Sequence, residues 1–204
     1  MAVEINLENK VALVTGGTRG IGKAIVNELL QSGAKVFATG TNLTQVEKLN
    51  KKNKNSLLTY LQLDLSEPNN VRKFISKTLK VTDIDILVNN AGINIVSDAD
   101  IISDEEFLQI QEINVHGPFL LAQAFGKQML NKNWGRIINI SSIWGVVTRP
   151  GRLSYSASKM ALLGISKTLA VEWAKNNVLV NSVSPGFTLT ELTKTTNTKQ
   201  ELKE

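Results

Sequence analysis

The sequence of 204 residues contains no cysteine, a single histidine and no long apolar run. Without cysteine it has no disulfide framework, no thiolate metal site and no cysteine nucleophile. No apolar stretch approaches the roughly 18 residues of a membrane span, and Met1 to Lys10 lack the apolar core of a signal peptide. We therefore expect a cytoplasmic protein without a membrane partner.

The composition, with 42% hydrophobic and 20% charged residues, is typical of one soluble domain, which we place over residues 1–204. Lys plus Arg exceed Asp plus Glu by 23 − 18 = 5. The positive charges are scattered, and their densest cluster, Lys48 to Lys54, is mixed with asparagine. We therefore expect no nucleic-acid partner. A basic surface also suits an anionic dinucleotide or an acidic carrier protein.

Short apolar runs alternate with amphipathic stretches along the chain. The runs predict strands over 11–14, 35–39, 57–63, 84–88 and 136–140 and from 178 onward; the stretches predict helices over 21–31, from 44, and over 71–79, 104–131 and 154–175. This alternation predicts the α/β class: a doubly wound parallel sheet with helices on both faces. Ligands of such sheets bind at the carboxyl ends of the strands, where glycine-rich and polar segments collect in this sequence.

A glycine-rich turn, Thr15 to Gly22, follows the first predicted strand and opens a helix. Glycines let the backbone turn sharply and lie close to a pyrophosphate, and a helix N-terminus presents free N–H groups to it. The turn therefore predicts a nucleotide site. Its spacing, Thr-Gly-x-x-x-Gly-x-Gly, differs from G-x-G-x-x-G and resembles the turn of the short-chain dehydrogenase/reductase family.

The resemblance recurs in order along almost the whole chain. Its further motifs are Asp64-Leu65, Asn89-Asn90-Ala91-Gly92, Asn114 in Asn-Val-x-Gly-x-Phe, Ser142, Tyr155-x-x-x-Lys159 and Pro185-Gly186. The chain is thus identified as a member of this family. It is most similar to the 3-oxoacyl-acyl-carrier-protein reductases, in Thr15 to Gly22 and in Asn181 to Phe187. The resemblance implies a Rossmann-type, NAD(P)-binding domain.

Four residues receive catalytic roles from the resemblance. Tyr155 is expected to be the general acid, with Lys159 lowering its pKa and holding the nicotinamide ribose. Ser142 would orient the substrate carbonyl, so that Ser142 and Tyr155 contact the substrate, and Asn114 would hold a water at a break in its helix. Bringing a tyrosine pKa from about 10 to about 7 takes about 4 kcal/mol. One cation about 4 Å away supplies that much at an effective dielectric near 20, so no metal is expected.

The stretch after the second strand, Thr39 to Asn42, has no carboxylate to bind the ribose of NAD. Arg19 offers a fork of donors to a 2′-phosphate, and the resemblance places Thr41 beside the same phosphate. We therefore expect NADP(H) rather than NAD(H). The expected cofactor contacts are Gly16, Thr18, Arg19, Gly20, Ile21, Gly22, Thr41, Asp64, Leu65, Asn90, Ala91, Gly92, Tyr155, Lys159, Pro185, Gly186, Thr188 and Thr190.

The family continues past Pro185-Gly186 through a substrate-covering segment, a further helix and a seventh strand, whereas this sequence ends at Glu204. We expect residues 191–204 to be a polar tail from a truncated lid region, and the final strand and helix to be missing. We favour the interpretation that the sequence is the ordered part of a longer protein over a truncated product or a short natural variant. The last strand then becomes an edge, with Val178, Val180 and Val183 exposed. A homo-oligomer through the long helices is expected.

The expected activity is NADP(H)-dependent reduction of a small-molecule carbonyl, foremost a 3-oxoacyl thioester borne by an acyl-carrier protein. One alternative is another ketone or secondary alcohol, such as a sugar, a steroid or a small alcohol. A second is nucleotide binding without turnover, because the lid is absent. Trp144, Arg149 and Arg152 lie where the substrate should enter. An arginine there could meet an acidic substrate or simply be a solvated loop residue.

Overall fold

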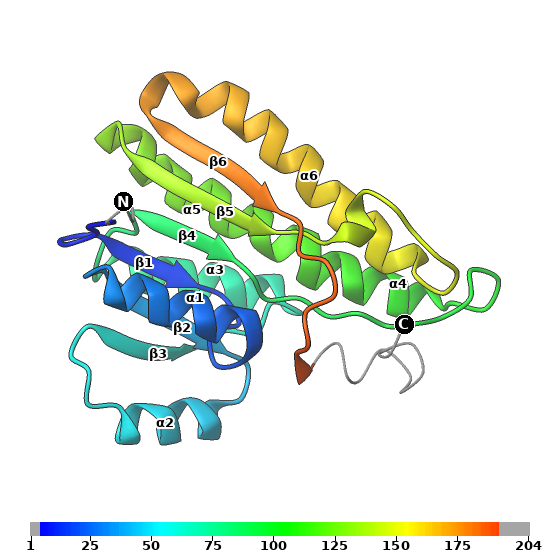
Figure 1. The fold of residues 1–204 in the computed structure, drawn as a ribbon, viewed down its shortest axis with the longest axis horizontal. Helices are drawn as coiled ribbons and strands as arrows, with labels where there is room; N and C mark the ends of the chain where they lie inside the picture. Colours follow the sequence, from blue (N-terminus) through cyan, green and yellow to red (C-terminus); the bar gives the residue numbers. More distant parts are fainter. Residues whose placement is uncertain (1–4, 192–204) are drawn as a thin grey trace.

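The computed structural model describes residues 5–191 and contains a six-stranded parallel sheet (Figure 1). The strands are β1 (Val11–Val14), β2 (Lys35–Gly40), β3 (Leu58–Gln62), β4 (Ile86–Asn89), β5 (Gly135–Ile140) and β6 (Val178–Val183). Their order is β3-β2-β1-β4-β5-β6, and every neighbouring pair is parallel. The strand order reverses between β1 and β4, which is where ligands of such sheets bind.

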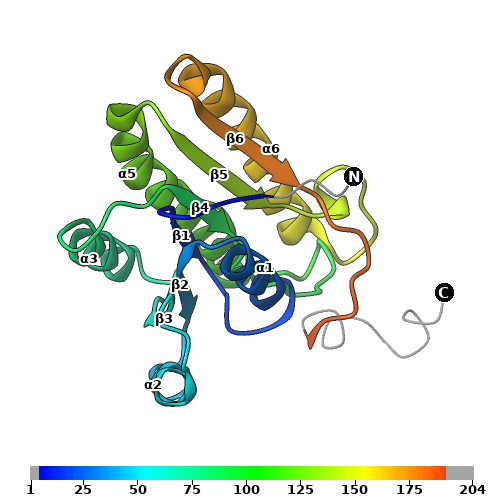
Figure 2. The ribbon, with the colours of Figure 1, turned by 60° about the vertical axis from the view of Figure 1, so that its left-hand side comes forward.

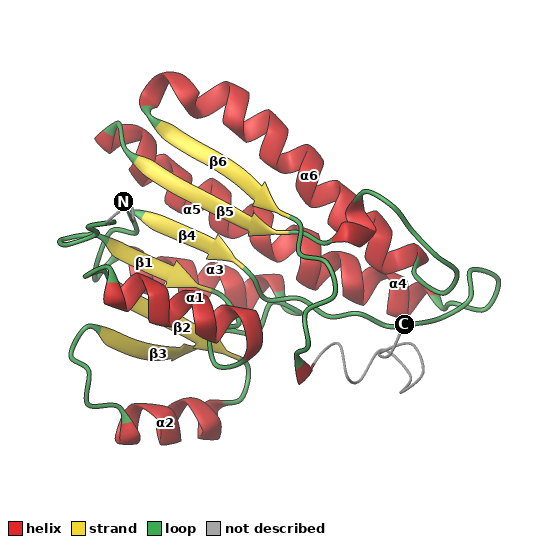
Figure 3. Cartoon of the chain, viewed as in Figure 1, coloured by secondary structure: helices red, strands yellow, loops and turns green. Residues whose placement is uncertain are grey.

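The helices connect successive strands. They are α1 (Gly20–Gln31), α2 (Leu43–Lys52), α3 (Pro68–Leu79), α4 (Asp104–Gln111), α5 (Gly117–Lys132) and α6 (Leu153–Trp173), with a π-helical segment η1 (Glu112–His116) and 3₁₀ turns η2 (Ile143–Gly145) and η3 (Ala174–Asn176) (Figure 3). The predicted helix over 104–131 is therefore α4 and α5 joined by η1. Helix α3 begins earlier than predicted, because Pro68 suits a first helical turn, where no N–H is needed.

Alternate strand residues enter two separate cores, one on each face of the sheet. Leu13 joins the core formed with α3, α5 and α6, whereas Ala12 and Val14 join the core formed with α1. Figures 1 and 2 show α1 on one face and α3 and α5 on the other. Burying each large apolar side chain contributes about 1.5–3 kcal/mol. The predicted doubly wound architecture with helices on both faces is confirmed.

Strand β6 corrects one expectation. Val178 and Val180 are buried, not exposed, because they face the core that Leu169 and Trp173 of α6 cover. Val183 is half exposed, as expected. Within residues 5–191, β6 pairs only with β5. Of the predicted tail, residues 192–204 lie outside the described part of the chain.

None of the helices in residues 5–191 is long and apolar enough to cross a membrane.

Candidate active site

The carboxyl ends of the strands form a cavity of about 350 Å³. The segment after β6 runs across these ends (Figure 1). Every residue of the expected cofactor set lines this cavity, together with Ser142. These residues are far apart in sequence. Most of them lie just after strands whose carboxyl ends share one edge of the sheet, and Tyr155 and Lys159 lie on α6, the helix that follows β5.

The glycine-rich turn disfavours side chains at two positions, Gly22 by close packing and Gly16 by its positive φ. A Cβ at Gly22 would lie 2.3 Å from the Gly16 carbonyl oxygen, and Gly16 itself has φ +63°. Helix α1 begins directly after the turn with no side-chain cap and no acidic residue in its first turn. Its N–H groups and the positive end of its dipole therefore suit an anionic group such as a pyrophosphate.

Two side chains tie the loops after β1 and β4 together. The Thr15 hydroxyl oxygen accepts bonds from the backbone N–H groups of Asn90 (2.9 Å) and Ala91 (3.0 Å). The Asn90 amide donates back to the carbonyl oxygens of Thr15 (2.8 Å) and Gly16 (3.2 Å). These bonds fix the two loops on either side of the point where the strand order reverses. The roles of Thr15 and of the Asn90 side chain in this bridge were not predicted from the sequence.

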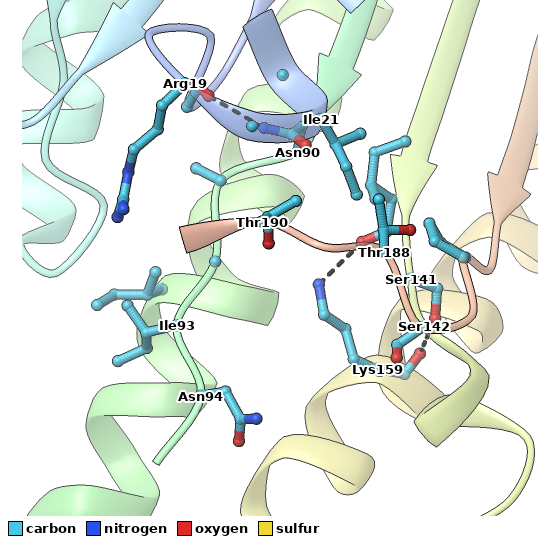
Figure 4. A pocket seen from close by; sticks show the side chains of 18 of the residues that line it. Arg19, Ile21, Asn90, Ile93, Asn94, Ser141, Ser142, Lys159, Thr188 and Thr190 are labelled. Atoms are coloured by element: carbon cyan, nitrogen blue, oxygen red, sulfur yellow. Dashed lines mark hydrogen bonds between the residues drawn. The ribbon is translucent and has the colours of Figure 1, made fainter. Parts of the chain in front are cut away.

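Arg19 lies at one end of the cavity, and Ser142 and Lys159 lie at the other (Figure 4). The Arg19 guanidinium pairs with the Glu191 carboxylate at 2.6 Å, and both side chains are more than half exposed. An exposed ion pair contributes only about 0–1 kcal/mol, so this contact is readily exchanged for another anion. Thr18 and Thr41 line the same cavity as Arg19.

Tyr155 and Lys159 lie one turn apart on α6, and Ser142 is the N-cap residue of η2. The Ser142 oxygen accepts a bond from the Trp144 N–H at 3.2 Å. Burial raises the pKa of Tyr155, and its interaction with the Ser142 side chain opposes that rise. The fold therefore brings the two predicted substrate-facing hydroxyls together, although thirteen residues separate them in sequence.

The Lys159 ammonium donates to the Ile140 carbonyl oxygen at the end of β5, at 2.8 Å (Figure 4). It lies 5.6 Å from the centre of the Tyr155 ring. Lys159 is buried, and burial lowers its pKa from 10.5 to about 8. The lysine thus lies beside Tyr155, with its hydrogen bond directed to the backbone.

The pKa of Tyr155 corrects an expectation. Burial raises it above the ordinary value of 10.0, and the Ser142 hydrogen bond and the charge of Arg152 only partly oppose that rise. The expectation that Lys159 alone brings this pKa to about 7 is therefore wrong for the chain by itself. The same dry environment that penalises the ammonium of Lys159 also penalises the phenolate of Tyr155.

Asn114 lies behind the cavity and is fully buried in η1. Its amide donates to the Ile93 carbonyl oxygen (2.9 Å) and to the Ser158 hydroxyl (3.0 Å), while its oxygen accepts from the Ile93 N–H (2.9 Å). The expected break in the helix at Asn114 is confirmed as the π-helical segment. Asn114 holds the loop after β4 against α6, and Ser158 in this link was not predicted.

The wall near Ser142 is aromatic and basic. Trp144 and Phe187 pack edge to face with ring centres 5.7 Å apart. Arg152 lines the cavity with only 2% of its surface exposed, and Arg149, which is partly exposed, lies 5.4 Å from the centre of the Trp144 ring. Phe187 was not predicted as a site residue, although it directly follows the Pro185-Gly186 motif and so lies at a strand end. Within residues 5–191, no group of three or more His, Cys, Asp or Glu side chains is placed to hold a metal.

A sheet whose strand order reverses above a glycine-rich turn, with Ser, Tyr and Lys at the end of the cavity, defines a Rossmann-type nucleotide-binding protein. The chain belongs to the short-chain dehydrogenase/reductase family: the family model described as short chain dehydrogenase matches residues 10–201. It is accordingly an oxidoreductase that acts on CH–OH groups.

Three relatives illustrate the match. The 3-oxoacyl-[acyl-carrier-protein] reductase of Aquifex aeolicus is 38% identical over 203 residues, which cover 94% of this chain and 79% of that protein. A solved short chain dehydrogenase/reductase family protein is 35% identical with a TM-score of 0.86, covering 93% of this chain and 79% of that one. A gluconate 5-dehydrogenase from Burkholderia cenocepacia, in complex with NADP and tartrate, is 30% identical with a TM-score of 0.87, covering 94% and 76%.

Proposed function

We propose that this chain is an NADP(H)-dependent carbonyl reductase with Tyr155 as its general acid. The observation that carries the proposal is the cavity itself, which joins the uncapped N-terminus of α1 and Arg19 at one end to Ser142, Tyr155 and Lys159 at the other. A bound dinucleotide would supply a hydride. The residues of the chain then have to orient the carbonyl and deliver a proton.

Ser142 and Tyr155 share the task at the carbonyl oxygen. The Ser142 hydroxyl donates a hydrogen bond that orients the oxygen, and the Tyr155 hydroxyl transfers its proton to that oxygen as the carbon gains the hydride. The raised pKa of Tyr155 keeps the phenol protonated at neutral pH, which is the form that reduction needs. The positive charge of Lys159 stabilises the phenolate that this transfer leaves.

The preference for NADP(H) rests on charge at the end of β2. No carboxylate lies in Thr39 to Asn42 to bind the ribose hydroxyls of NAD, and the exposed Arg19 guanidinium would bind a 2′-phosphate in exchange for Glu191. The structural relative from Burkholderia cenocepacia holds NADP. We take NADP(H) as the cofactor on these grounds.

Two substrate classes remain as candidates. The first is a 3-oxoacyl thioester borne by an acyl-carrier protein, which the name of the Aquifex aeolicus relative supports. The second is a small ketone or secondary alcohol of another class. Buried Arg152 favours an acidic compound of this second kind, as does the tartrate in the gluconate 5-dehydrogenase complex.

The test is the oxidation of NADPH and of NADH by the purified protein, with acetoacetyl-CoA and a panel of small ketones and oxo acids. We expect turnover with NADPH to exceed turnover with NADH. A clear preference for NADH would contradict the cofactor proposal. Tight NADPH binding without oxidation across the whole panel would instead favour a nucleotide-binding protein without turnover.

A further inference from the structure

Arg152 lies at the substrate end of the cavity. It is the N-cap residue of α6, one turn before Tyr155, and its side chain is almost completely buried. Burial raises the pKa of Tyr155, and the charge of Arg152 opposes that rise. The sequence left open whether this arginine is solvated, and its burial excludes that interpretation.

The charges that line the cavity are divided between its two ends. The acidic residues Asp64 and Glu191 belong to the other end: Asp64 follows β3 and accepts bonds from Ser66, and Glu191 pairs with Arg19. Within the described lining, the titratable groups beside Ser142 are Tyr155, Lys159 and Arg152. On η1, which packs against α6, Glu112 and His116 pair with each other. The described lining of this end therefore carries two basic groups and no carboxylate. The Asp98 carboxylate lies outside the lining, beside Gly151, where a Cβ would be 4.0 Å from its oxygen.

The surroundings of Arg152 strengthen its attraction for an anion. Trp144, Phe187 and Ile143 give this end of the cavity an apolar wall. Charges act over longer range beside apolar walls than in open water. A guanidinium also presents five N–H donors in a planar fork that matches a carboxylate, so it can hold one in addition to contacts within the chain.

We propose that Arg152 binds a carboxylate on the substrate, so that the site accepts an oxo acid in preference to a neutral ketone or thioester. This inference rests on the proposed carbonyl reduction and decides between its two substrate candidates. In the step itself, the carbonyl carbon gains a hydride from the dinucleotide and the oxygen gains the Tyr155 proton. The product is a hydroxy acid whose carboxylate is unchanged. Because Arg152 lies one helical turn from Tyr155, the carboxylate should lie a few bonds from the carbonyl.

The test compares ligands that share one ketone. We would measure kcat/KM for acetoacetate, ethyl acetoacetate and acetoacetyl-CoA with NADPH in the unmodified protein, Arg152→Gln, Arg152→Lys and Arg72→Gln. Arg72 is the control, since it is an exposed arginine on α3 that does not line the cavity. Removing one partner of a buried charged pair typically lowers affinity by about 30- to 5000-fold.

We expect the unmodified protein to prefer acetoacetate over its ethyl ester by about 100-fold, and Arg152→Gln to abolish most of that preference. Arg152→Lys should keep an intermediate preference, and Arg72→Gln should keep all of it. A preference for the ester or the thioester in the unmodified protein would overturn the inference, as would equal losses for acid and ester in both Arg152 variants. Either result would leave carbonyl reduction standing, whereas no turnover of any ligand would contradict the proposed function itself.

Discussion

Replacing Lys159 with methionine should stabilise the protein while it removes catalysis. Because burial lowers the lysine pKa from 10.5 to about 8, keeping the ammonium charged in the folded chain costs about 3 kcal/mol at neutral pH. Methionine also loses the 2.8 Å hydrogen bond to the Ile140 carbonyl, and this loss lowers the free energy of unfolding by about 1 kcal/mol. Methionine fills a similar volume without a charge. The expected gain in the free energy of unfolding is therefore about 1–2 kcal/mol.

The difference in the free energy of unfolding between Lys159→Met and the unmodified protein should depend on pH. Below the folded-state pKa of about 8, the lysine is charged in both the folded and unfolded states, and the full cost applies. Between that value and 10.5, the folded chain releases its proton first, so the unmodified protein gains stability as the pH rises. The advantage of Lys159→Met should therefore be complete at neutral pH and shrink across this interval.

Urea denaturation at neutral and at alkaline pH measures the effect. Lys167→Met is the control, because Lys167 is an exposed lysine on the same helix. It should change the free energy of unfolding by less than about 0.5 kcal/mol at either pH. A Lys159→Met variant less stable than the unmodified protein at neutral pH would contradict the cost assigned to the buried ammonium, as would a difference that does not change with pH.

Two further predictions concern cofactor choice and packing. Thr41→Asp places a carboxylate beside the expected 2′-phosphate, so kcat/KM for NADPH should fall by about 10- to 100-fold while that for NADH is retained; an unchanged ratio would contradict the assignment. Gly164→Ala should raise the free energy of unfolding by about 1 kcal/mol, since a Cβ there meets nothing within 4 Å. Gly126→Ala should instead lower it by about 1–3 kcal/mol, since its Cβ would lie 2.6 Å from the Trp173 ring. Urea denaturation distinguishes the two.

The architecture could be predicted because the apolar runs and the amphipathic stretches of the sequence indicate the same strands and helices that the fold contains. The run Val11 to Val14 is too short and too apolar for a surface helix, and it is buried in a central strand. The glycine-rich turn could be predicted as a nucleotide site because its close packing requires glycine, and the structure leaves no room for a side chain at Gly22. Parallel strands bring their carboxyl ends to one edge, so residues after separate strands could be assigned to one cavity without knowledge of any side-chain contact.

Features that depend on tertiary packing could not be predicted. The sequence indicates that Tyr155 and Lys159 share a helix face, but the direction of the ammonium depends on the Ile140 carbonyl of another element. The burial of Arg152 depends in the same way on the surrounding packing, and the sequence alone allowed two interpretations of it. The pairing of Arg19 with Glu191 joins residues 172 positions apart, a separation at which no local pattern gives a signal.

We propose that Tyr155 delivers the proton, while Ser142 orients the carbonyl and Lys159 stabilises the phenolate. The most direct test is Tyr155→Phe, with NADPH binding and carbonyl reduction measured on the same preparation. The variant should bind NADPH within about 2-fold of the unmodified affinity and lose at least about 100-fold in turnover, since a positioned general acid contributes 100-fold or more. Turnover equal to that of the unmodified protein would contradict the account.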